Sequence, residues 1–173
     1  MSEISAGTRR LTVNAAFLKD IKDDNRDLKI LIDRLRTVTK PRPTAANHWL
    51  ELVRLLADLR DQLAIHFGLE EAYGYFDLAT DADAQMSAAA ETLKAEHADL
   101  FESCRHLSEA IAGVVTPEGF GDDLGEGQDP ELTTAQEKIL DRIERFLFQF
   151  HRHEESELKL ILDALDEDLG GGD

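Results

Sequence analysis

The sequence has little of several features that mark other classes of protein. A single cysteine, Cys104, among 173 residues excludes an intramolecular disulfide framework. Basic residues number 19 against 36 acidic ones, and the net charge of −17 would repel nucleic acids and anionic membranes. No apolar run approaches the about 18 residues of a membrane span, and residues 1–11 lack the apolar segment of a signal peptide. We therefore expect a cytoplasmic protein whose natural small partners are cations.

Glycine and proline are also scarce, with 11 and 4 residues, and aromatic residues make up only 6% of the chain. This composition favours helices over strands. Four long segments carry apolar residues at alternating steps of three and four, which is the pattern of an amphipathic helix. The segments predicted to be helical are residues 9–39, 47–76, 81–115 and 130–165.

Breaker and capping residues separate these segments. Two prolines within Lys40–Pro43 are expected to end the first helix. Thr80–Asp83 has the spacing of a capping box before the third helix, and Asp129 is a suitable N-cap before Pro130 for the fourth. The first two connections are short, so consecutive helices are expected to be antiparallel neighbours.

Together these features predict an all-α protein with one domain over residues 1–173, folded as an up-down-up-down four-helix bundle. The core is expected to span about residues 9–165. Residues 116–131 contain four glycines and six acids without a basic residue, which predicts a flexible acidic loop. Residues 166–173 are expected to fray.

Polar residues interrupt the apolar stripe at comparable heights on three of the predicted helices. The inward positions are occupied by His66 and Glu70 on the second helix, His97 on the third, and His153 and Glu157 on the fourth. A buried unpaired polar group costs about 1–3 kcal/mol, and an unpaired carboxylate costs more. His-x-x-x-Glu places both side chains on one face about a turn apart, so a shared metal cation would remove the cost. Nitrogen and oxygen ligands without thiolate favour non-haem iron, with zinc or manganese as further options.

The fourth helix offers a second register for the same pair. His151 and Glu155 repeat the four-residue step on a neighbouring line, which meets charged residues upstream. The line of His153 stays apolar back to Ile139. We therefore favour His153 and Glu157 as ligands, with His151 and Glu155 as the alternative pair.

Other residues with reactive side chains receive simpler interpretations. Cys104 is expected to be a small core residue, because no histidine or second cysteine is placed to activate it. His48 and His106 are expected at the surface or in a second layer. Glu71 and Glu154 are interpreted as solvated carboxylates, or as groups that hold a ligand histidine by its other nitrogen.

These motifs resemble those of the hemerythrin-like family, also known as HHE cation-binding domains. The resemblance spans roughly residues 9–165 and is carried, in the family's order, by His66–Glu71, Glu96-His97 and His153–Leu158. It implies a four-helix bundle that holds a non-haem iron centre with histidines and carboxylates from its helices.

Two positions depart from the family pattern. Asn25 stands where the first-helix histidine is expected, and Leu93 stands where hemerythrins proper carry a second histidine on the third helix. The resemblance then implies a site with fewer protein ligands, for one or two metal ions. It also implies a protein that binds, senses or detoxifies oxygen, nitric oxide or peroxide, or that handles iron. The sequence assigns no enzymatic activity and identifies no protein partner. The alternative is a metal-free helical bundle that acts as a protein-interaction module with a degenerate metal site.

Overall fold

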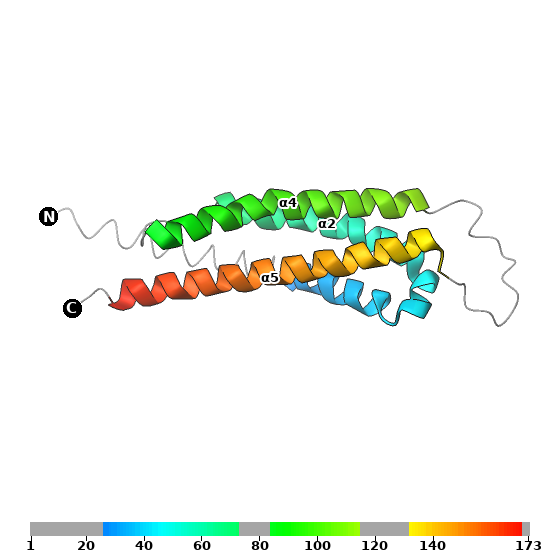
Figure 1. The fold of residues 1–173 in the computed structure, drawn as a ribbon, viewed down its shortest axis with the longest axis horizontal. Helices are drawn as coiled ribbons and strands as arrows, with labels where there is room; N and C mark the ends of the chain where they lie inside the picture. Colours follow the sequence, from blue (N-terminus) through cyan, green and yellow to red (C-terminus); the bar gives the residue numbers. More distant parts are fainter. Residues whose placement is uncertain (1–25, 73–83, 115–131, 171–173) are drawn as a thin grey trace, which may run out of the picture.

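The computed structural model describes residues 26–72, 84–114 and 132–170, which contain helices and no strand. A first helix covers residues 26–39. It is followed by the 3-10 helix η1 (Arg42–His48) and by the α-helices α2 (Trp49–Ala72), α4 (Ala84–Val114) and α5 (Thr134–Gly170). Successive long helices run in opposite directions along the length of the molecule (Figure 1). The predicted all-α four-helix bundle is confirmed.

The connection around the prolines contains more structure than expected. The first helix ends at residue 39, as predicted, but the chain then forms η1 before α2 begins. Pro41 is the N-cap of η1 and Pro43 lies in its first turn, where the missing N–H of proline leaves no helical hydrogen bond unmade. Arg42 lies 2.7 Å from Asp141 of α5, which ties this short helix to the last one.

The predicted start of the last helix is wrong by several residues. We expected it at Pro130, but α5 begins at Thr134 and residues 132–133 are not helical. The backbone N–H of Gln136 donates to Thr133 Oγ1 at 3.3 Å, and the N–H of Thr133 donates to Gln136 Oε1 at 2.9 Å. This reciprocal capping box satisfies two N–H groups that an uncapped helix leaves open. The helix also continues past the predicted end at Leu165, to Gly170.

The core follows the predicted stripes closely. All four long helices contribute to one large apolar cluster, which includes Leu35, Leu56, Leu107 and Ile143. A second cluster contains, among the described residues, Ala90, Leu93, Leu160 and Ala164, with Met86 packed against it. The five inward polar residues lie between the two clusters along the helices, in a layer that apolar side chains close at both ends.

Several expectations fall on residues outside the described ranges. These include the first helix before residue 26, the ends of the second and third helices beyond 72 and before 84, the acidic loop 116–131, and Asn25. Within the described part of the chain, no helix is both long enough and apolar enough to cross a membrane.

Candidate metal centre

Three helices bring the five inward polar residues together. His66 and Glu70 come from α2, His97 from α4, and His153 and Glu157 from α5, and each is only 2–3% exposed. On α2 and α5 the four-residue step puts the imidazole and the carboxylate on one face. The neighbouring stripe positions are apolar, so their burial carries these side chains inward as well.

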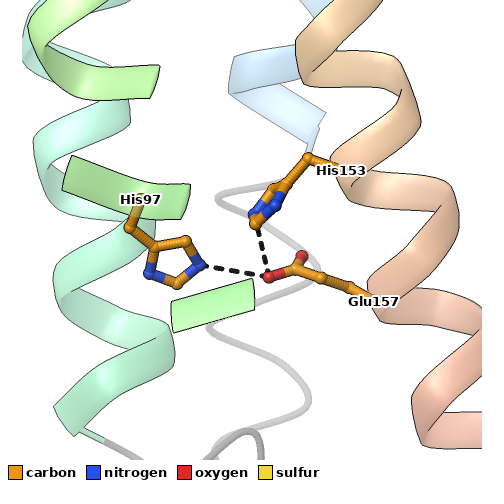
Figure 2. A group of neighbouring side chains, drawn as sticks. All are labelled: His97, His153 and Glu157. Carbon is orange, nitrogen blue, oxygen red and sulfur yellow. Dashed lines mark hydrogen bonds and ion pairs between the residues drawn. The ribbon is translucent and has the colours of Figure 1, made fainter. Parts of the chain in front are cut away.

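Glu157 is the centre of one side of this cluster. Its Oε1 atom lies 3.1 Å from His97 Nε2 and 3.0 Å from His153 Nε2, so one carboxylate oxygen bridges imidazoles from α4 and α5 (Figure 2). The ligand atoms of these three residues all lie within 4.8 Å of one another. That spacing allows one ion to contact all three, because metal–nitrogen and metal–oxygen bonds are about 2.0–2.2 Å long.

Glu70 connects the remaining histidine to this group. Its Oε1 lies 3.3 Å from His66 Nε2, and its Oε2 lies 3.5 Å from His97 Nε2. His97 Nε2 therefore faces both buried carboxylates. The cluster thus consists of a compact group, His97, His153 and Glu157, with His66 and Glu70 beside it.

An aromatic ring covers the histidines. Phe67 stacks on His97, with ring centroids 4.2 Å apart and planes 12° apart, and it meets His153 edge-on at 5.9 Å. Phe67 is itself 5% exposed. Its ring excludes water from one side of the cluster and restricts the rotation of both imidazoles.

The two buried carboxyl groups have opposite electrostatic environments. Burial, together with the negative charge of Glu157, raises the pKa of Glu70 to about 8. Burial acts on Glu157 in the same direction, but its close contacts with His153 and His97 outweigh it and hold the pKa of Glu157 below its ordinary value. Burial would lower the pKa of His153, yet its contacts with Glu157 and Glu96 raise it overall. In the absence of a cation, Glu70 thus carries a proton at the place where a metal ion could bind.

Two buried atoms at this place have no hydrogen-bond partner within the described part of the chain, namely Glu70 Oε2 and His153 Nε2. His153 Nε2 lies near Glu157 Oε1, but the two atoms are not aligned for a hydrogen bond. A carboxylate oxygen and an imidazole nitrogen are both ligands for first-row transition metals. The residues present therefore fit a metal ion, which would satisfy both atoms.

Comparison with known families supports the same chemistry. The family model described as the hemerythrin HHE cation binding domain matches residues 16–145. The chain belongs to this family. It is accordingly a cation-binding protein, as the resemblance of its motifs implied. No curated protein and no solved structure matches the chain.

The matched residues do not cover the whole cluster of this HHE domain. His66, Glu70 and His97 lie inside the match, whereas His153 and Glu157 lie beyond its end. It is the packing of α5 against α4 that carries the last two residues into the same layer.

The structure separates the two registers of α5. His151 and Glu155 are exposed, with side-chain exposures of 57% and 66%, and they face each other at 3.4 Å on the outside of the bundle. His153 and Glu157 are buried. Continuity of the apolar line upstream predicted this orientation.

The other residues with reactive side chains lie where we expected them. His48 and His106 are exposed, and Cys104 is fully buried in the large apolar cluster. Burial raises the pKa of the Cys104 thiol to about 12, so the thiolate does not form at neutral pH.

Glu96 and Phe67 both touch the cluster, although the sequence indicated them only as members of the family motifs and predicted no contact for either. Glu96 accepts a hydrogen bond from His153 at 2.9 Å, and Phe67 stacks on His97. The one feature of the sequence that could have indicated these contacts is that each residue is adjacent to a cluster histidine, since Glu96 precedes His97 and Phe67 follows His66. A neighbour in sequence points to a different side of its helix, so only the placement of the next helix shows what it meets.

Proposed function

We propose that this HHE domain binds non-haem iron, one or two ions, through His66, Glu70, His97, His153 and Glu157. The observation that carries the proposal is the bridging position of Glu157 Oε1 between His97 Nε2 and His153 Nε2, inside a layer that excludes water. In addition, buried Glu70 Oε2 has no hydrogen-bond partner among the described residues.

The charge around the cluster supports a cation. Three imidazoles are surrounded by five carboxyl groups, since Glu71, Glu96 and Glu154 also lie within 3.3 Å of a histidine nitrogen. The carboxyl groups outnumber the imidazoles, so this set of side chains has a net negative charge. A divalent or trivalent ion would compensate that charge and replace the proton on Glu70.

The number and type of donors favour iron over zinc. Structural zinc sites are closed by four ligands, often with thiolates. Among the described residues this layer offers five nitrogen- or oxygen-donor side chains and no thiol, and such sets suit iron or manganese, which accept more than four ligands.

Deep burial restricts what could reach the ion. All five side chains are nearly inaccessible to solvent and Phe67 covers two of the histidines. A substrate of ordinary metabolite size does not fit such a layer, which favours oxygen, nitric oxide or peroxide. Bound iron would supply redox and ligand-binding chemistry toward these small molecules.

The direct test is metal analysis of protein produced with iron, together with anaerobic titration of the metal-free protein with ferrous iron. We expect one or two iron ions per chain in the wild type. His153→Ala should abolish binding, and His151→Ala, on the same helix but exposed, should leave it intact. A wild type that neither contains nor takes up iron, zinc or manganese would overturn the proposal and favour a metal-free interaction module.

A further inference from the structure

Each histidine of the cluster meets a carboxylate from a neighbouring helix that is adjacent in sequence to another cluster residue. Glu71 of α2 meets His97 of α4, Glu96 of α4 meets His153 of α5, and Glu154 of α5 meets His66 of α2. The distances are 3.3, 2.9 and 3.2 Å respectively. These three contacts connect the three helices in a closed cycle at the level of the cluster.

The Glu96 contact differs from the others in what it does to its histidine. Glu96 Oε2 accepts from His153 Nδ1, the nitrogen that faces away from Glu157. Nε2 of the same ring lies 3.0 Å from Glu157 but is not aligned for a hydrogen bond within the described part of the chain. In the neutral imidazole only one nitrogen carries the proton. The aligned contact places that proton on Nδ1 and leaves the Nε2 lone pair facing the cluster.

We propose that Glu96 is a positioning residue, which fixes His153 in the tautomer and orientation that present Nε2 to a bound metal. This inference rests on the proposed metal site, although its first test needs no metal. A partner on the far nitrogen also increases the basicity of a ligand imidazole and prevents the ring from rotating.

Glu71 and Glu154 provide internal comparisons. Glu71 contacts His97 Nδ1, but the distance is longer, and His97 Nε2 has its own hydrogen bond with Glu157 at 3.1 Å. Glu154 approaches His66 Nε2, which Glu70 also contacts at 3.3 Å. Neither carboxylate selects one nitrogen of its histidine as clearly as Glu96 does.

The metal-free protein permits the first test. Long-range ¹H–¹⁵N NMR spectra distinguish protonated from bare ring nitrogens, and we expect neutral His153 of the wild type to carry its proton on Nδ1. Glu96→Ala should abolish this preference. Glu96→Gln should retain it, because the amide oxygen still accepts the Nδ1 proton. Glu96 is about half exposed, so its truncation leaves no buried cavity.

The second test measures ferrous iron affinity in the same variants under anaerobic conditions. Glu96→Ala should weaken binding about 10–100-fold, as is typical when the partner of a ligand histidine is removed, and Glu96→Gln should restore most of it. Asp99→Ala is the matched control, since Asp99 is exposed on the same helix and its loss removes one negative charge.

The outcomes separate the two proposals. An unchanged tautomer in Glu96→Ala, or equal weakening of iron binding by Glu96→Ala, Glu96→Gln and Asp99→Ala, would overturn the positioning role and leave the metal site intact. A wild type that binds no iron would overturn the proposed function, and the NMR result would then decide by itself whether Glu96 selects the tautomer of His153.

Discussion

The large apolar cluster and the polar layer beside it are stabilised in different ways. The large cluster draws residues from all four long helices, including Leu28 and Leu35 of the first. Among the described residues, the second cluster contains Ala90 and Leu93 of α4 and Leu160 and Ala164 of α5, with partly buried Met86 of α4 against it. The large cluster can hold the helices together by burial of apolar surface alone.

The difference shows what the polar layer requires. The buried side chains of the large cluster are apolar and are stabilised by packing against their neighbours, and Trp49 Nε1 is a buried polar atom there without a hydrogen-bond partner among the described residues. In the layer, the contacts among two carboxyl groups and three imidazoles leave buried atoms without hydrogen bonds in the described part of the chain. The stability contributed by the large cluster should therefore not change with metal, whereas that of the polar layer should depend on it.

The largest effect is expected in the large cluster. Phe146→Ala should lower the free energy of unfolding by about 3–5 kcal/mol, because Phe146 is 1% exposed and stacks on Phe150 with centroids 6.1 Å apart. Urea unfolding with ferrous iron and with a chelator should give the same loss. A loss that disappears under one condition would show that the two regions are coupled.

The next largest effect concerns iron binding by the polar layer. Iron at about 100 times its dissociation constant should stabilise the wild type by about 2.7 kcal/mol, if it binds only the folded protein. His97→Ala should lose this gain, so the variant should differ from the wild type more with iron than with chelator. His106→Ala, exposed on the same helix, is the control. An equal effect of His97→Ala under both conditions would make His97 a purely structural residue.

Glu70 should give the metal-free protein an unusual pH dependence. Burial and the charge of Glu157 raise the pKa of Glu70 from its ordinary 4.5 to about 8. The folded state then binds more protons than the unfolded state, so the free energy of unfolding should fall as pH rises between these values. Glu70→Gln removes the titration and should raise stability near pH 8 by on the order of 1–3 kcal/mol.

His153 affects the same measurement above pH 6.5, its ordinary pKa. Its raised pKa stabilises the fold at low pH, and this contribution is also lost as pH rises. Glu157, whose pKa is lowered, has the opposite effect near its ordinary pKa of 4.5. Chemical unfolding of metal-free wild type and Glu70→Gln between about pH 5.5 and 6.5 therefore reports the Glu70 contribution as the difference between the two proteins. A wild-type stability that rises over this interval would contradict the assigned environment of Glu70.

The smallest effect concerns the backbone beside the layer. Gly68 lies inside α2, exposed, and a Cβ atom there would meet no other atom within 4 Å. Gly68→Ala should raise the free energy of unfolding by about 0.5–1 kcal/mol, since glycine disfavours helix interiors. Gly113 has the same space but lies next to the end of α4, so Gly113→Ala should gain less. Thermal melts of both variants test the difference.

Periodicity predicted the buried faces well because each is a property of one helix. Every stripe position predicted on α5, from Ile139 to Ala164, is buried, and the interruption at His153 and Glu157 was visible in the same pattern. Helix ends were harder to predict. We predicted the start of α5 from Asp129-Pro130, whereas the capping box that starts it is formed by Thr133 and Gln136. Helix ends are less certain than helix faces, because several residues near an end can act as caps.

The sequence by itself determined which residues turn inward, since a fixed rise and rotation per residue make the inward face of a helix readable from spacing. It therefore contained the five polar residues of the layer as candidates. Only the tertiary structure decided which of their atoms meet: that Glu157 bridges two imidazoles, that Phe67 stacks on His97, and that Glu96 reaches His153 on the next helix. Those contacts depend on the rotation and axial position of one helix against another, and these are set by packing across the whole bundle, which no single stripe specifies.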